Sequence, residues 1–161
     1  MAEQEQAAEK TLAISKIFVK DFSFESPQSP AVFRRSEWKP QTNLNLRSSH
    51  SVVDDNVHEV VLTITVEAKD DENTLFLVEI QQAGLFEIAG YEGDELAAIA
   101  GSFCPNILFP YAREAIATTI QKGGFPEFVL QPINFDALYM QSKQQAATAQ
   151  AEAEATQAES H

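Results

Sequence analysis

The sequence has little of what several large classes of protein depend on. It contains one cysteine, Cys104, in 161 residues, so an internal disulfide is impossible and a reducing compartment is expected. It has no apolar run long enough to span a bilayer. Residues 1–10 are acidic and lack the apolar centre of a signal peptide. Together these absences predict a cytoplasmic protein that does not insert directly into a membrane.

Basic residues are also scarce. The chain has 11 Lys and Arg against 24 Asp and Glu, a formal net charge of -13. This balance argues against a nucleic-acid partner, because such binding needs clustered Lys and Arg. Residues 70–112 contain eight carboxylates and no basic residue. The stretch indicates either a solvated acidic surface or a docking face for a basic partner.

The residues that usually carry catalysis or metals are not arranged for either. Cys104 with His50 or His58 could form a thiol centre, but no base is placed beside it by sequence, which favours a buried structural cysteine. Asp54, Asp55 and His58 could ligate a metal, although a polar turn is the simpler interpretation. The six glycines are scattered and form no phosphate-binding loop. We therefore predict no enzymatic activity, no cofactor and no metal.

Period-two alternation predicts strands over residues 12–25, 42–48, 57–68 and 74–88. In the first, Leu12, Ile14, Phe18, Phe22 and Phe24 share one face, but Ile17 and Val19 fall on the other, so the alternation is imperfect. In the last, one face carries Phe76, Val78 and Ile80. The opposite face of the sheet is expected to present Asp21, Glu25, Leu75, Leu77 and Glu79.

The pattern then becomes helical. We predict one helix over residues 96–103 that Pro105 ends, and a second over residues 111–122 that Pro110 opens and Gly123-Gly124 closes. Asn134 is expected to cap a third helix through Met140. Strands followed by helices predict an α+β fold, in which helices cover one face of a four-stranded antiparallel sheet. The predicted domain spans residues 11–141, between a flexible tail at 1–10 and a polar, mobile tail at 142–161.

Two aromatic residues need separate treatment. Phe33 and Trp38 lie in a proline-bounded loop, where residues are usually at the surface. Either the loop folds down and caps the core, or these side chains line an apolar binding groove.

Several long segments resemble the SecB family of protein-export chaperones. They are CPNILFPYARE at residues 104–114, GFP at 124–126, PINFDALY at 132–139, KDFSFE at 20–25 and FLVEIQQ at 76–82. The resemblance covers about Leu12 to Met140.

The resemblance implies a homotetramer, a dimer of dimers, that binds unfolded precursor proteins and delivers them to the ATPase SecA. SecA contacts the acidic outer face of the sheet in this family, which here implies Asp21, Glu25, Leu77 and Glu79, together with Leu75. Apolar grooves hold the precursor, and we assign Phe33, Trp38, Leu44 and Leu46 to them. The expected oligomer interface comprises Phe76, Val78, Ile80, Tyr111, Ile116 and Ile120.

A second interpretation stays open at this point. Some SecB-like proteins serve toxin–antitoxin systems, so the chain could instead be an oligomeric adaptor that binds one dedicated partner.

Overall fold

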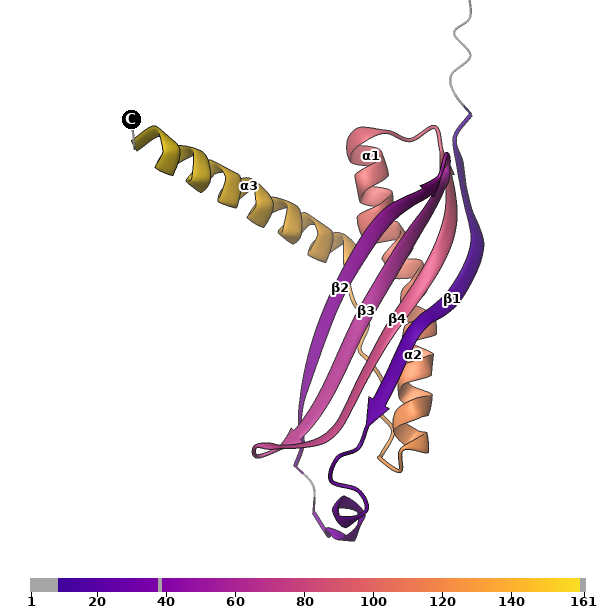
Figure 1. The fold of residues 1–161 in the computed structure, drawn as a ribbon, viewed down its shortest axis with the longest axis vertical. Coiled ribbons are helices and arrows are strands. Elements are labelled where there is room, and N and C mark those ends of the chain that lie inside the picture. The colour runs from indigo at the N-terminus through magenta and orange to yellow at the C-terminus, as the bar shows by residue number, and fades with distance from the viewer. Residues whose placement is uncertain (1–8, 38, 160–161) are drawn as a thin grey trace, which may run out of the picture.

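A four-stranded antiparallel sheet forms one layer of the molecule, and helices pack against one of its faces (Figure 1). The computed structural model describes residues 9–37 and 39–159. The strands lie in the order β1-β4-β3-β2 and are β1 (Thr11–Glu25), β2 (Gln41–Asp54), β3 (Val57–Asp70) and β4 (Asn73–Ala89). The helical elements are η1 (Ala31–Arg34), α1 (Gly93–Ala98), the π-helix η2 (Ile99–Phe103), α2 (Cys104–Lys122) and α3 (Phe135–Glu159). The predicted α+β fold class is confirmed.

Strands β3 and β4 form the centre of the sheet and follow the predicted alternation most closely. Val60, Leu62 and Ile64 of β3 are fully buried on the face that the helices cover. A tight turn joins the two strands, and in it Asp71 adopts a φ of 54°. Aspartate tolerates this left-handed conformation better than most residues, so the polar sequence at the turn permits the hairpin.

Helix α2 supplies the other half of the core. Leu108, Ala112, Ile116 and Ile120 recur every four residues along one side of α2, and all four are fully buried. They pack on the inner faces of β3 and β4. Burial of each branched side chain is worth about 1.5–3 kcal/mol, so this seam holds helix and sheet together.

The prediction that Pro105 ends one helix and Pro110 opens another is wrong. The chain is helical without a break from Gly93 to Lys122. The π-helix η2 leads directly into Pro105, and the Cys104 N–H reaches back five residues to the Ile99 carbonyl. A wider turn of this kind absorbs the altered hydrogen bonding of a proline that follows it. Pro105 is buried, so packing offsets the backbone bond that its ring removes.

The ends of α2 and α3 confirm two of the predicted caps. Gly124 closes α2 with a φ of 89°, and the Asn134 Oδ1 accepts a hydrogen bond of 3.0 Å from the Ala137 N–H. Helix α3 does not stop near Met140, however, but runs on to Glu159 and projects away from the sheet (Figure 1). Its Ala, Gln and Glu are strong helix formers, and residues 141–158 are exposed.

The predicted tails are only partly described. Residues 1–8 lie outside the described part of the chain, and Lys10 is anchored by its Nζ, 3.1 Å from the Glu95 carboxylate. The mobility expected of both tails stays a prediction. None of the helices in the described ranges is long and apolar enough to cross a membrane.

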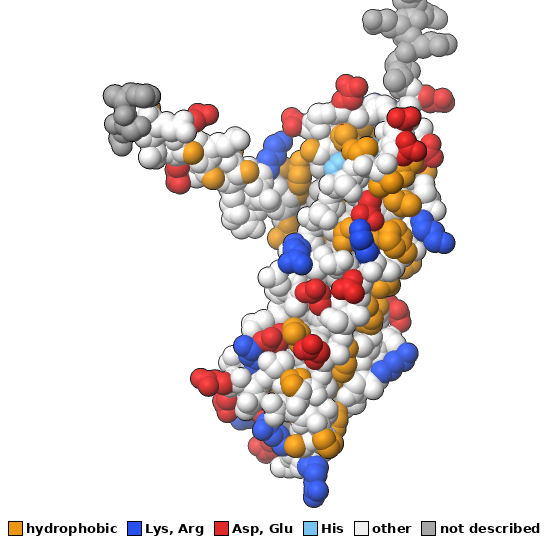
Figure 2. Space-filling view, viewed as in Figure 1, with side chains coloured by type: hydrophobic (Ala, Val, Ile, Leu, Met, Phe, Trp, Pro, Cys, Tyr) orange, Lys and Arg blue, Asp and Glu red, His pale blue; other side chains and the backbone are white. Residues whose placement is uncertain are grey.

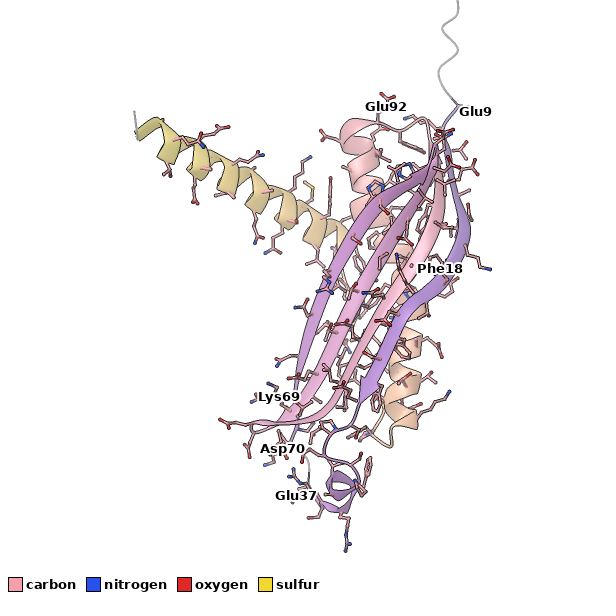
Figure 3. The ribbon with its side chains drawn as sticks, in the orientation of Figure 1. Glu9, Phe18, Glu37, Lys69, Asp70 and Glu92 are labelled. Carbon is pink, nitrogen blue, oxygen red and sulfur yellow. The ribbon has the colours of Figure 1, made fainter. Side chains whose placement is uncertain are left out.

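Strand β1 breaks the predicted alternation at two bulges. The register with β4 shifts between Ile14 and Lys16 and again between Val19 and Asp21. Each extra residue reverses the side of the sheet to which later side chains point. Ile17 and Val19 therefore join the face that carries Leu12 and Phe22, and Phe18 turns to the other face. Phe18 is labelled on β1 in Figure 3, and its carbonyl accepts a 3.1 Å hydrogen bond from the Gln82 Nε2.

Candidate functional site

A row of side chains on β2 joins two hollows on the helix-covered face of the sheet. Thr42, Leu44 and Leu46 alternate along the strand and lie opposite Ala68, Val66 and Ile64 of β3. Leu44 is 47% exposed, whereas Leu46 is half-buried against the core. Strand β2 is an edge of the sheet, so this row has solvent beside it instead of another strand.

The first hollow lies between β2 and the start of α3. It has a volume of about 480 Å³, and its walls include Leu46, Arg47, Gly101, Phe135 and Tyr139. Gly101 lets the Tyr139 ring approach closely, because a Cβ on it would lie 2.7 Å from that ring and would displace it. Phe135 is held by Phe109, with ring centroids 5.6 Å apart. These α3 and η2 residues were not among the predicted groove residues.

The second hollow lies at the other end of the same row. It has a volume of about 360 Å³ and takes its lining from four separate segments: Arg35, Ser36 and Pro40; Thr42; Ala68, Leu75 and Phe76; and Pro126, Glu127 and Phe128. Its floor is apolar, and Arg35 reaches the Asp70 carboxylate at 2.9 Å, at the hairpin end of the sheet labelled in Figure 3. Only the assembled fold brings these segments together.

Phe33 belongs to an aromatic cluster beside the second hollow. Its ring centroid is 5.4 Å from that of Phe125, which in turn contacts Phe24 and Phe76. Phe33 also covers Gly124, where a Cβ would meet its ring at 2.9 Å. Its side chain is still 44% exposed, so it both caps the core and presents an aromatic edge outward. Trp38 lies outside the described residues.

The opposite face of the sheet carries acidic side chains with basic and apolar ones between them (Figure 2). Asp21 and Glu25 of β1 lie opposite Gln81 and Leu77 of β4, and Glu79 accepts a 2.8 Å hydrogen bond from the Thr65 hydroxyl. Residues opposite one another in an antiparallel pair point to the same face. The fold therefore brings together four of the five residues predicted for this surface, which we call the acidic face: Asp21, Glu25, Leu77 and Glu79.

Leu75 is a correction to that prediction. It is 1% exposed and belongs to the core. The register between β3 and β4 passes from Ala68–Phe76 to Lys69–Thr74, which leaves Leu75 without a partner. This bulge turns Leu75 inward beside Phe76 and interrupts the alternation that placed it on the outer face.

Ion pairs neutralise the border of the acidic face but not its centre. Lys20 lies 2.9 Å from Glu59, and Lys69 lies 3.0 Å from Glu67. Among the described residues, Asp21, Glu25 and Glu79 form no such pair with Lys or Arg. Unpaired carboxylates of this kind attract a basic partner over about a Debye length.

Most residues predicted for an oligomer interface are buried within the chain itself. Phe76 is 6% exposed, and four others are fully buried: Val78, Ile80, Ile116 and Ile120. They have no surface left for another copy, because α2 packs directly on the sheet. Tyr111 is 52% exposed and is the one residue of this group that reaches the surface.

An uncovered apolar row lies instead on edge strand β1. Ile14 and Val19 are each 51% exposed and Phe22 is 38% exposed. All three share the helix-covered face of the sheet, opposite Phe86, Gln82 and Ile80 of β4. The sequence alone could not align them, because the two bulges in β1 set their common orientation.

The residues considered for catalysis or metal binding do not form a reactive centre. Cys104 is fully buried, and burial raises the pKa of its thiol to about 12, so it is not a thiolate near neutral pH. His50 and His58 hydrogen-bond to each other, with 2.7 Å between Nε2 and Nδ1. Asp54 accepts a hydrogen bond from the Asp55 N–H, and the two residues lie where the chain turns from β2 into β3. No three potential metal ligands gather anywhere in the described ranges.

Comparisons with known proteins agree on one family. The model of the family described as preprotein translocase subunit SecB matches residues 4–146. The protein-export protein SecB of Nitrosococcus oceani is 53% identical over 142 residues, covering 88% of this chain and 87% of that protein. The SecB of Marinobacter nauticus is 50% identical over 165 residues, covering 97% of this chain and 99% of its own length.

A solved structure supports the fold independently. It is the Mycobacterium tuberculosis SecB-like chaperone in complex with a ChAD peptide from an antitoxin. Its TM-score is 0.63 at 16% identity, and the match covers 76% of this chain and 90% of that one. At this identity the likeness concerns the fold. Because the family model spans almost the whole chain and relatives share half of its residues, this chain belongs to the SecB family.

Proposed function

We propose that this chain is a cytoplasmic chaperone for protein export. It binds precursor proteins before they fold, keeps them competent for translocation and delivers them to SecA. The observation that carries this proposal is the groove on the helix-covered face, in which the exposed Leu44 connects two partly apolar hollows. Membership of the SecB family supports the same function.

The groove suits an extended, unfolded segment better than a folded surface. Its two hollows lie at the ends of one β2 row, so a client chain running along β2 would place separate apolar side chains in each. Full burial of one such side chain contributes about 1.5–3 kcal/mol and requires no particular sequence. The free backbone edge of β2 can also pair with an extended client. A folded protein has most of its apolar side chains buried and most of its backbone groups already paired, so it offers much less of either.

Tight binding then depends on several weak sites acting together. We propose a homotetramer, assembled as a dimer of dimers, in which one long client occupies grooves on more than one copy and gains avidity. The apolar row Ile14, Val19 and Phe22, together with Tyr111, is the surface that we assign to self-association. Such a row exposed on an edge strand is a site where another copy can bury apolar area.

The acidic face is the proposed docking site for SecA. Glu25 lies opposite the half-buried Leu77, Glu79 is two residues along the same strand, and Asp21 extends the row opposite Gln81. A basic partner surface with an apolar centre fits this arrangement, and salt weakens its attraction. The sheet separates this face from the groove, so a client and SecA can be bound at the same time.

A dedicated adaptor or antitoxin-type chaperone is the second candidate. It is favoured by one observation, the antitoxin peptide bound to the structurally similar Mycobacterium tuberculosis protein. That protein shares the fold at low identity, whereas the export proteins share half of the sequence, so export is the better-supported function.

The deciding experiment compares two forms of one client. A polypeptide held unfolded by removal of its disulfides is titrated with the chaperone, and the same polypeptide in its folded form serves as the control. Tight binding to the unfolded form alone is expected. Equal binding to both forms, or binding to neither, would contradict the proposal and favour a dedicated adaptor.

A further inference from the structure

The two described histidines form a close pair between neighbouring strands. His50 on β2 and His58 on β3 place Nε2 and Nδ1 2.7 Å apart, with ring centroids at 5.0 Å and an angle of 19° between the rings. In the ladder His50 lies opposite Val60 and His58 lies opposite Val52. The pair is thus diagonal across the two strands on the helix-covered face, and His58 is only 5% exposed.

The hydrogen bond between these rings can persist when the pair binds one proton, but not when it binds two. With both rings neutral, one nitrogen donates and the other accepts. A first proton preserves this bond, because an imidazolium can donate to a neutral imidazole. A second proton makes both facing nitrogens donors and opposes two positive charges. Burial, followed by the charge of His58, lowers the pKa of His50.

The elements around the pair supply no carboxylate to neutralise a second charge. Facing positions on β2, β3 and β4 are Ser48, Val52, Val60 and Phe86. The π-helix η2 is IAGSF and contains no titratable side chain. The charged and titratable groups of neighbouring elements lie on the other sheet face or have partners of their own. Glu59 pairs with Lys20 on the other face, and Glu87 shares that face opposite Val57. The remaining groups are Asp54 with the Asp55 N–H, Glu95 with Lys10, Lys10 over Tyr91, Asp94 with Lys143, Asp136 with Ser102, and the buried Cys104 thiol.

The position of the pair connects it to the groove. His50 follows Leu46, Arg47 and Ser48 on β2, and these three residues line the first hollow. Strand β2 is an edge, and among the described residues β3 is the only strand paired with it. A repulsion between His50 and His58 therefore acts on the strand that forms the groove wall.

We propose that the His50–His58 pair is a proton-sensitive clasp, which holds β2 on β3 while it carries at most one proton and releases β2 when both rings are protonated. Acidification then loosens the wall of the first hollow and weakens client binding there. The effect on clients rests on the proposed chaperone function, whereas the clasp itself does not.

The sign of the pH dependence follows from proton linkage. An unfolded histidine has a pKa of about 6.5, and the folded pair resists its second proton. Below that pH the unfolded chain binds more protons than the folded one, so the free energy of unfolding falls as pH falls. The contribution is fully present above about pH 7.5 and is lost as the pH drops through the lowered pKa of His50.

The first test follows the histidine ring protons of the full chain by NMR from pH 8 to pH 4.5. The sequence contains three histidines, and His161→Ala and His50→Gln variants assign the signals. We expect His50 to titrate below the ordinary histidine pKa of about 6.5. A His50 pKa at the ordinary value of about 6.5 would overturn the proposal.

The second test is urea unfolding of the wild type and of His50→Gln, which can keep the hydrogen bond without titrating. Below pH 6.5 we expect the unfolding constant of the wild type to rise relative to that of His50→Gln, by up to about tenfold per pH unit for one linked proton. His58→Gln is the second variant and should show the same relief. Parallel pH profiles for all three proteins would refute the clasp.

Client binding is measured separately so that the two proposals can fail independently. An unfolded client is titrated at pH 7.5 and pH 5.5 with the wild type and with His50→Gln. A loss of affinity at pH 5.5 in the wild type alone supports release by the clasp. Absence of binding at pH 7.5 refutes the chaperone function, and the NMR and urea results still decide the clasp.

Discussion

Removal of the Leu44 side chain is the most direct test of the groove. Leu44 is 47% exposed in the free protein, and this exposed part is what a client can cover. Because full burial of a leucine is worth about 1.5–3 kcal/mol, covering 47% of it contributes about 0.7–1.4 kcal/mol. Leu44→Ala should therefore weaken binding of an unfolded client about three- to tenfold per groove, and further where one client occupies several grooves.

The measurement is calorimetric titration with a client that cannot form its disulfides. Val53→Ala is the matched control, since Val53 lies on the same strand, is 58% exposed and lines neither hollow. Both variants should stay folded, with the free energy of unfolding lowered by about 1–2 kcal/mol at most, because part of each side chain is already buried in the free protein. Unchanged affinity for Leu44→Ala, or an equal loss for Val53→Ala, would refute the assignment of the groove.

Three further outcomes are expected. Ile116→Ala should lower the free energy of unfolding by about 2–5 kcal/mol in chemical denaturation, because Ile116 is fully buried between α2 and the sheet; a loss below about 1 kcal/mol would contradict that packing. Val19→Asp should shift the proposed oligomer toward smaller species in analytical ultracentrifugation, with Val53→Asp as the control, and an unchanged mass would exclude the β1 row as an interface. Cys104→Ser should keep client binding, and Cys104 should resist alkylation at pH 8, because its pKa is raised to about 12; rapid alkylation of the folded protein would show that the thiol is accessible.

The alternation of β3 and β4 was readable because both strands are central. Each has a covered face and an open face, so a two-residue period in the sequence maps directly onto burial. The same reasoning failed at Leu75, where a single unpaired residue in β4 reversed the pattern. A bulge is defined by the partner strand, and one strand's sequence does not contain that information.

The helix boundaries were predicted wrongly for a different reason. Pro105 and Pro110 each favour a break in a helix, and the sequence pattern alone therefore predicted two separate helices. In the folded chain Pro105, Leu108 and Phe109 are buried together against the core, and a π-turn precedes them. Tertiary packing outweighed a backbone penalty of about 3 kcal/mol for an interior proline.

Only part of the candidate site was predictable, because its residues come from several separate segments of the chain. Leu44 and Leu46 share one strand, so periodicity identified them together. The remaining walls of the hollows come from α3, η2 and the segment that follows α2. Contacts between segments so far apart in the chain depend on tertiary structure, and no local pattern indicates them.

The two proposed binding surfaces are separated by one sheet, and this arrangement limits how they can influence each other. Glu79 on the acidic face is hydrogen-bonded to Thr65, and Thr65 lies opposite Asn45, the neighbour of Leu44 on β2. This is the one short route along the backbone from the acidic face to the groove that these contacts define.

Distant sites without shared partners are additive within about 0.3–0.5 kcal/mol. If Leu44→Ala and Glu79→Gln are additive in client affinity, the sheet acts as a rigid partition, and the proposed transfer of a client to SecA does not use a route through Glu79 and Thr65. A larger coupling energy would mean that SecA docking on Glu79 reaches the groove through Thr65 and β2.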